Sequence, residues 1–217
     1  SGKHVFCEKP LALHAAELEE IAEALRAPNA PLLSLGFNRR FAPLAQQMRA
    51  FLLPDEPRVV HYRVNAGFLP STHWLHDPAV GGGRIIGEGC HFFDFLTFLI
   101  GQPPSEVWAQ SLPDDGRYHQ DNAVIHLRYP DGSLGTIEYL ANGDKSFPKE
   151  RVEVFSAGAV AVLDDFRSLE LVRDGRRQMI RSRLRQDKGH LAGWQTFLSA
   201  VQTSGQPPIP YPQIWGT

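Results

Sequence analysis

Apolar and polar positions follow different periods along the chain. Short apolar runs at 4–7 and 32–36 flank a segment, 12–26, whose apolar positions recur at helical spacing. A second helix is predicted over about 42–53. Strand, helix, strand, helix is the order of a parallel α/β sheet, so the beginning of the chain predicts an α/β unit.

Beyond Pro57 the pattern changes. Apolar and polar residues alternate over 59–66, which predicts a strand with two different faces. A polar, Gly-rich loop follows over 67–83, and 86–100 is apolar on nearly all sides, as is typical of a buried helix. Further strands are expected over 105–112, 121–129, 134–141, 150–156, 159–164, 168–173 and 178–183, before a final helix over about 189–203. This part therefore predicts an antiparallel-rich sheet with helices on one face.

Composition excludes several classes of protein. The chain has 217 residues, with 22 Lys and Arg against 24 Asp and Glu, and its net charge of −2 does not favour nucleic acid or an anionic membrane. Cys7 and Cys90 are too few for a disulfide framework and fit a reducing, cytoplasmic compartment. The longest apolar run, 92–100, contains Asp94 and falls short of the ~20 residues that span a bilayer.

Both ends of the chain adjoin regular elements. The chain starts on the lead-in to its first strand and stops just after a helix and a Pro-rich turn, whereas domains usually begin and end in loose segments. We expect the chain to be cut from a longer one, with the missing part upstream.

Glu8, Lys9 and Pro10 stand at the carboxyl end of the first predicted strand. Open α/β sheets bind ligands beyond such strand ends. A lysine there can donate protons or hydrogen bonds to a substrate hydroxyl, and partial burial lowers the pKa of an amine. The alternative is a surface lysine in a turn.

A second candidate follows three glycines at 81–83. Glu88, His91 and Asp94 recur every three residues and fall broadly on one side of the predicted helix. Ionisable groups on an apolar helix are costly unless they are paired or used, and a histidine that titrates near neutral pH is a natural acid–base group. The alternative is a core histidine satisfied by Asp94 one turn on.

Two other groups give weaker signals. His73, His76 and His91 fit no strong metal-ligand spacing, so no metal site is expected. Arg39 and Arg40 follow a strand and can grip a carboxylate or phosphate. Exposed arginines at a helix start are the alternative.

Three motifs together resemble the glucose–fructose oxidoreductase, inositol dehydrogenase and rhizopine-catabolism (Gfo/Idh/MocA) family of NAD(P)-dependent oxidoreductases. They are GKHVFCEKP at 2–10, GFNRRF at 36–41 and GGGRIIGEGCHFFD at 81–94. The resemblance implies the C-terminal end of a Rossmann domain over 1–40. An open-faced, mostly antiparallel mixed-sheet domain would follow over 41–217, with helices on one face. No G-x-G-x-x-G occurs here, so the dinucleotide loop is expected upstream.

The same resemblance implies roles for individual residues. Lys9 would lie beside the nicotinamide and the reacting carbinol, and His91 would act as acid and base on the hydroxyl. Pro10 would shape the turn, as a cis peptide. The remaining site residues are assigned on the same basis: Glu8, Lys9, Pro10 and Arg40 to NAD or NADP, and Asn38, Arg39, His73, Trp74 and Asp94 to the substrate.

One position departs from the family pattern. Many members carry an aspartate four residues before the histidine, where this chain has Gly87. Glu88 is adjacent but rotated by about 100° around a helix. Either Glu88 has taken over as a catalytic residue, or Lys9 and His91 act without that carboxylate. The RIIGEGCH sequence also resembles a subgroup in which this unit follows a zinc-dependent alcohol-dehydrogenase-like region.

The leading hypothesis is therefore the C-terminal part of an NAD(P)-dependent oxidoreductase. It would transfer hydride between nicotinamide and a secondary alcohol of a sugar, inositol or nucleotide sugar, as a homo-oligomer associated through the sheet face, and this chain alone would be inactive. The alternative is a non-catalytic sugar-binding or oligomerisation module, which the absence of aspartate at position 87 supports. Nothing in these residues selects NAD over NADP or one substrate over another.

Overall fold

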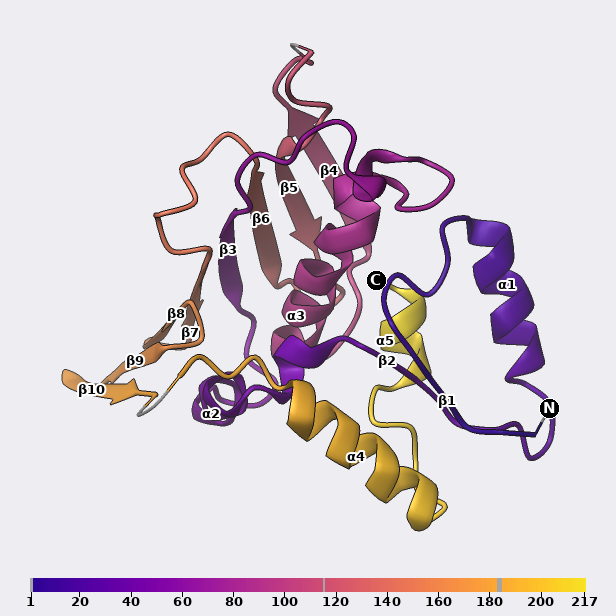
Figure 1. Ribbon diagram of the computed structural model, residues 1–217. Coiled ribbons are helices and arrows are strands. Elements are labelled where there is room, and N and C mark those ends of the chain that lie inside the picture. Colours follow the sequence, from indigo (N-terminus) through magenta and orange to yellow (C-terminus); the bar gives the residue numbers. More distant parts are fainter. Residues whose placement is uncertain (1, 115, 183–184) are drawn as a thin grey trace.

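Two β-sheets organise the chain in the computed structural model, which describes residues 2–114, 116–182 and 185–217 (Figure 1). The smaller sheet holds β1 (Val5–Cys7) and β2 (Leu33–Leu35), which pair in parallel and are joined by α1 (Ala15–Ala24). The predicted strand, helix, strand order is confirmed. The helix is shorter than predicted because Glu17 accepts the backbone N–H of His14 and so starts the helix after that residue.

A 3-10 turn, η1 (Asn38–Phe41), and α2 (Pro43–Phe51) lead into the larger sheet. Its central strand β3 (Val59–Asn65) runs parallel to one neighbour, β6, and antiparallel to the other, β7. The other strands are β4 (Glu106–Ser111), β5 (Asn122–Arg128), β6 (Leu134–Leu140), β7 (Glu150–Ser156), β8 (Ala159–Asp164), β9 (Ser168–Arg173) and β10 (Arg176–Arg181). The order β10-β9-β8-β7-β3-β6-β5-β4, with the remaining pairs antiparallel, confirms the mostly antiparallel mixed sheet. The last strand begins two residues earlier than the expected 178–183, and residue 183 lies outside the described ranges.

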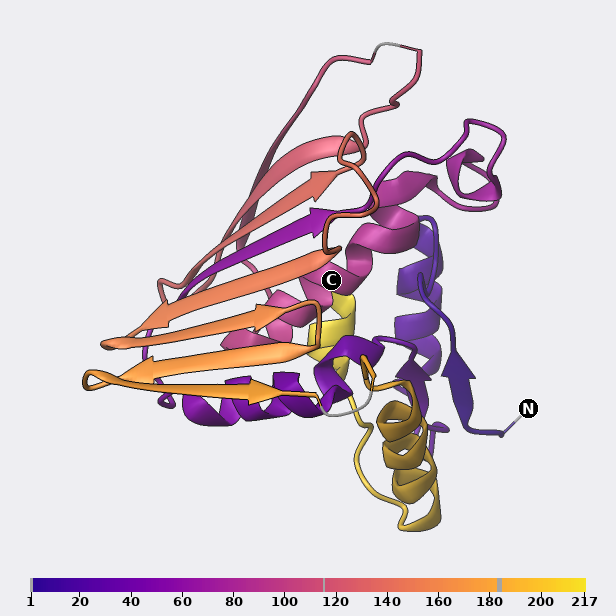
Figure 2. The same cartoon turned by 60° about the vertical axis from the view of Figure 1, so that its left-hand side comes forward.

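Helices cover one face of this sheet and leave the other open (Figure 2). Alternate residues of β3 explain this, because Val60, Tyr62 and Val64 are buried while His61 is exposed. The covering helix α3 (Cys90–Ile100) is buried along most of its length and forms the main core with the sheet and α2. The apolar pattern of 86–100 thus identified the buried helix correctly.

The start of that helix differs from the prediction. Residues Ile85–Gly89 form a π-helical turn, η3, and the α-helix begins only at Cys90. A π turn contains an extra residue, so the three-residue spacing no longer places Glu88 on the face of His91. Gly82 and Gly83, with φ of +69° and +85°, give the chain the left-handed conformations with which it enters this turn.

The C-terminal segment returns to the first sheet. Helix α4 (His190–Gln202) is followed by the short α5 (Tyr211–Trp215), which the Pro-rich sequence did not suggest. Ile209 and Ile214 pack with Leu35 and Phe37 in a small second core, so the end of the chain is joined to the β1–β2 unit. No helix in the described ranges is both long and apolar enough to span a bilayer.

Candidate functional site

A polar pocket of about 270 Å³ lies where several distant segments meet. The end of β1, η1, the loop after β3, the π turn and the start of β7 each contribute to its walls. Its polar lining consists of Lys9, Arg39, Arg84, Glu88, His91 and Lys149. Four of these, Lys9, Arg39, Glu88 and His91, were predicted from the sequence.

Lys9 enters the pocket from the carboxyl end of β1. Its peptide bond to Pro10 is cis, which confirms the turn implied by the family resemblance. The Lys9 ammonium donates a hydrogen bond to the carbonyl oxygen of Gly87 in the π turn. The two motifs that sequence reasoning singled out, 78 residues apart, are therefore in direct contact.

His91 is 8% exposed, and its Nδ1 is buried without a hydrogen-bond partner. Burial, followed by the positive charges of Arg39 and Lys9, lowers the pKa of this imidazole to about 2. His91 is therefore neutral at physiological pH, and the surrounding positive charges oppose its protonation. The alternative in which Asp94 satisfies this histidine is wrong, because Asp94 is bound to Arg40 instead.

Arg39 forms the buried side of the pocket. Its Nε and Nη2 donate to the two carboxylate oxygens of Glu150 at 2.7 and 3.0 Å. Tyr62 and Lys188 donate to the same carboxylate, each at 2.5 Å. Burial would raise the pKa of Glu150, but Arg39 and Lys188 outweigh it and hold that pKa well below its ordinary value. This network fixes Arg39 as a rigid cation rather than an exposed arginine.

Glu88 lies in the pocket wall but is held away from His91. Its carboxylate accepts hydrogen bonds of 2.5 Å from Lys149 and from the Tyr139 hydroxyl, and Arg84 lies 3.7 Å away. Burial opposes ionisation, but Lys149 and Tyr139 lower the pKa of Glu88 below its ordinary value. Glu88 is thus ionised near neutrality and acts on Lys149 more directly than on His91.

Trp74 stands at the mouth of the pocket and is 56% exposed. An exposed indole face at a polar pocket suits the apolar C–H face of a sugar ring. The neighbouring His73 accepts the backbone N–H of Leu75 through its Nδ1 and caps a short 3-10 turn, and it does not line the pocket.

Other predicted site residues lie elsewhere. Arg40 and Asp94 form a buried ion pair that ties η1 to α3, and burial raises the pKa of Asp94 despite this pairing. Asn38 donates to the Lys188 carbonyl at 2.7 Å. Glu8 is exposed, its carboxylate lies over Gly36, and neither Glu8 nor Asn38 lines the pocket with His91.

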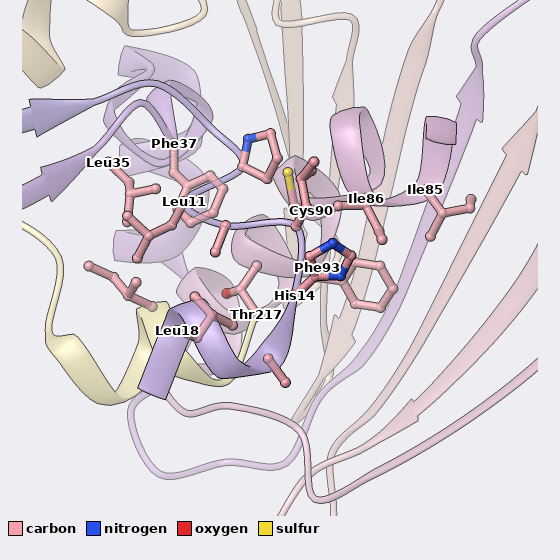
Figure 3. Close-up of a pocket in the computed structure, with 15 residues that line it drawn as sticks. Leu11, His14, Leu18, Leu35, Phe37, Ile85, Ile86, Cys90, Phe93 and Thr217 are labelled. Carbon is pink, nitrogen blue, oxygen red and sulfur yellow. The ribbon is translucent and has the colours of Figure 1, made fainter. Parts of the chain in front are cut away.

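A second, apolar pocket of about 310 Å³ lies on the other side of the same two motifs (Figure 3). Pro10 and Cys90, the sequence neighbours of Lys9 and His91, line it, and Figure 3 shows Cys90 beside Ile86 and Phe93. Burial raises the pKa of the Cys90 thiol to about 12, so it is uncharged. The Lys9–Pro10 and Cys90–His91 pairs thus separate a polar pocket from an apolar one.

Sequence reasoning missed Lys149 and Arg84. Lys149 precedes β7 and reaches the pocket only because β7 pairs with β3. Its signal was the pair Lys149–Glu150 at a strand start, since a charged residue on the inner face of a strand needs a buried partner. Arg84 follows the glycine triplet directly, donates to the Gly67 carbonyl at 2.7 Å and lies 3.5 Å from Asp121.

The structure explains the glycine at position 87. A Cβ atom there would overlap the Leu75 side chain and lie 2.7 Å from the Gly81 carbonyl oxygen. Leu75 fills the space that an aspartate side chain would need, and the Gly87 carbonyl takes the Lys9 ammonium. Within residues 2–114, 116–182 and 185–217, no group of three or more His, Cys, Asp and Glu is arranged to hold a metal ion.

The fold and the pocket together define an α+β domain with a small polar pocket beside a parallel βαβ unit. Residues 55–159 match the GFO/IDH/MocA C-terminal domain. The chain is 28% identical to myo-inositol 2-dehydrogenase of Thermotoga maritima, over 95% of this chain and 64% of that protein. It is 33% identical to inositol 2-dehydrogenase 2 of Paenarthrobacter aurescens, over 81% of this chain and 54% of that protein.

A crystal structure of an oxidoreductase domain protein from Kribbella flavida shares the fold, with a TM-score of 0.80 and 18% identity over 98% of this chain and 69% of that one. The chain is thus similar to the Gfo/Idh/MocA family of oxidoreductases over most of its length. It spans between about half and two thirds of the length of these two curated relatives.

Proposed function

We propose that the protein containing this chain transfers hydride between NAD or NADP and a secondary alcohol of a sugar, inositol or nucleotide sugar. The observation that carries the proposal is the meeting of Lys9 and a neutral His91 in one small polar pocket. The dehydrogenase relatives support the same reaction class and do not favour a non-catalytic module.

The two residues have complementary roles at the substrate hydroxyl. Neutral His91 accepts the hydroxyl proton as the carbinol is oxidised, and the Lys9 ammonium donates a hydrogen bond that stabilises the developing negative charge on that oxygen. In the reverse direction His91 returns the proton. Trp74 packs against the ring, and Glu88 orients Lys149.

The apolar pocket of Figure 3 suits the flat nicotinamide ring. When bound, the nicotinamide supplies the carbon that takes or gives the hydride. Pro10 and Cys90 contribute apolar walls there and exclude water, while Lys9 and His91 face the polar side. We expect Glu8 and Arg40 to act indirectly, through the turn after β1 and the packing of η1.

We infer a division at about residue 40, with 1–40 belonging to a Rossmann domain and 41–217 to a substrate domain. The parallel β1–α1–β2 unit supports the first part. The exposed side chains of Leu191, Trp194 and Leu198 form a stripe along α4, with Trp194 stacked on Phe6 of β1, as expected of a surface that a larger sheet domain covers.

The open sheet face is proposed as the surface of a homo-oligomer. Leu134, Val59, Phe155, Val160 and Val172 are in register across five adjacent strands on that face. The first three are at least 40% exposed, and a continuous apolar row of this kind marks an association surface. We also propose a cytoplasmic location, since Cys7 and Cys90 are both free thiols.

The experiment is hydride transfer by the protein as encoded by its gene, followed at 340 nm with a panel of polyols and sugars. Lys9→Met and His91→Ala are each expected to abolish turnover while calorimetry still detects cofactor and substrate binding. His126→Ala, at an exposed histidine of β5 outside the pocket, is the control and keeps turnover. Binding without turnover in the unaltered protein refutes the proposal and supports a non-catalytic module.

A further inference from the structure

The pocket carries more positive than negative charge. Four of its lining side chains are cations, namely Lys9, Arg39, Arg84 and Lys149, and Glu88 is the one carboxylate among the lining residues of the described chain. Binding of a neutral polyol does not require excess positive charge. Placing several cations together in a partly buried site also costs folding free energy.

Carboxylates behind the pocket wall reduce this excess without removing it. Glu150 neutralises one charge but is shared between Arg39 and Lys188. Asp121 lies 3.5 Å from Arg84, and the Glu88 carboxylate forms ion pairs with both Lys149 and Arg84. Counting these neighbours, five cations face three carboxylates, which leaves two positive charges uncompensated while His91 is neutral.

Lys9 contributes directly to the excess. Its ammonium is bound to the Gly87 carbonyl, and among the described residues no carboxylate comes within ion-pair distance of it. The electrostatic surroundings of His91 agree, because Arg39, Lys9 and Lys149 all oppose its protonation and Glu150 is the principal group that favours it. The field inside the pocket is therefore positive around Lys9 and His91.

We propose that the substrate is a monosaccharide-sized polyol that carries its own anionic group, a carboxylate or a phosphate, held in the pocket by Lys149, whose side chain is 38% exposed. This inference rests on the proposed function and narrows its substrate class. An anion on the substrate neutralises the uncompensated charge in a site where screening by water is weak. A volume of about 270 Å³ is below the range of ~300–1,000 Å³ typical of larger ligands, which favours a simple sugar acid or sugar phosphate over a nucleotide sugar.

The test compares matched pairs of substrates with the protein as encoded by its gene. Glucitol and gluconate, glucose and glucuronate, and glucose and glucose 6-phosphate differ in an anionic group, and a UDP-sugar tests the size limit. We expect kcat/KM and calorimetric affinity to favour an anionic member by about tenfold or more at low ionic strength. The preference is expected to shrink in 0.5 M NaCl, because exposed charge is screened.

Charge variants give effects of opposite sign. Lys149→Gln is expected to weaken binding of the anionic substrate about fivefold, the value of one partly screened charge, and Lys149→Arg to restore most of it. Glu88→Gln, which removes a negative charge, is expected to strengthen that binding. Neither changes the affinity for the neutral member by as much. Lys145→Gln, an exposed lysine outside the pocket, is the control and leaves both affinities unchanged.

Each result has a distinct meaning. Turnover of neutral polyols as efficient as that of their anionic partners, or preference for the UDP-sugar, overturns this inference and leaves the hydride-transfer proposal standing. Equal loss of anionic and neutral binding in Lys149→Gln also overturns it, because the residue is then structural. Absence of hydride transfer with every substrate and both cofactors overturns the proposed function itself. Calorimetry then still shows whether the pocket binds the anionic member of each pair more tightly than the neutral one.

Discussion

A neutral, buried His91 makes the stability of the fold depend on pH in a defined window. The pKa of this imidazole is lowered from 6.5 to about 2 by burial, Arg39 and Lys9. In the unfolded chain the imidazole regains its ordinary pKa. Below about pH 6.5 the unfolded state therefore binds a proton at His91 that the folded state does not bind. Stability therefore falls as the pH decreases from 6.5 towards 2 and is unaffected by this group above about pH 7.5.

The magnitude follows from the size of the shift. Each pH unit below 6.5 lowers the free energy of unfolding by about 1.4 kcal/mol for one proton bound only by the unfolded state. Acidification from pH 7.5 to 5 therefore removes about 2 kcal/mol of stability through His91 alone. The lowered pKa of Glu150 also reduces stability on acidification, but in a separate pH range. Its effect begins only below about pH 5, where the carboxylate of the unfolded chain starts to take up protons. The interval from pH 7.5 to 5 thus isolates histidine.

The assay is urea unfolding of the wild type and of His91→Gln at half-unit intervals between pH 5 and 7.5. The wild type is expected to lose about 2 kcal/mol more than the variant across this range. His126→Gln, which alters an exposed histidine of the open sheet face, is the control and keeps the wild-type slope. Parallel pH profiles for wild type and His91→Gln would refute the reasoning, since the folded protein would then protonate His91 as readily as the unfolded chain.

Three further predictions concern packing, charge and assembly. Gly87→Ala is expected to cost about 1–3 kcal/mol of unfolding free energy by overpacking against Leu75, and about 1 kcal/mol less in a Leu75→Ala background; additive urea-unfolding costs would contradict this contact. Glu150→Gln leaves Arg39 without its buried anion and is expected to cost about 3–5 kcal/mol, so a urea-measured loss below about 1 kcal/mol would show that the pair is solvated. Phe155→Lys on the open face is expected to shift the protein to smaller species in sedimentation velocity without lowering its melting temperature, and an unchanged sedimentation coefficient would remove that face from the assembly.

Local periodicity predicted the elements because each depends on a nearby pattern. The alternation in β3 reflects burial on one side of the strand, and the all-round apolarity of α3 reflects burial on nearly every side of the helix. The π turn at Ile85–Gly89 escaped because it depends on one extra residue and on contacts with Leu75 and the Gly81–Gly83 backbone. Helical spacing consequently placed Glu88 on the face of His91, which the π turn prevents, while Asp94 keeps its helical spacing but pairs with Arg40.

The site was predictable only where the resemblance or a strand end marked it. Lys9 and His91 belong to motifs whose meaning is carried by the family pattern. By contrast, Arg39 pairs with Glu150 across 111 residues and Arg40 with Asp94 across 54. Such partners are brought together by the sheet and by η1, and a charge pair of this kind leaves no periodic trace. Adjacent arginines in one motif therefore have different surroundings, since Arg39 lines the pocket and Arg40 does not.

Glycine in place of aspartate at position 87 is better explained by a change in the hydrogen-bond partner of Lys9 than by loss of activity. Leu75 occupies the space of the missing side chain, and the Lys9 ammonium is held by the Gly87 carbonyl in its place. A carbonyl oxygen fixes the position of Lys9 as a carboxylate would, but it contributes no full negative charge. The positioning of Lys9 is thus retained, and one positive charge is left that the proposed anionic substrate would neutralise. The feature of the sequence that favoured a non-catalytic module accordingly becomes the reason to expect a dehydrogenase with an anionic substrate.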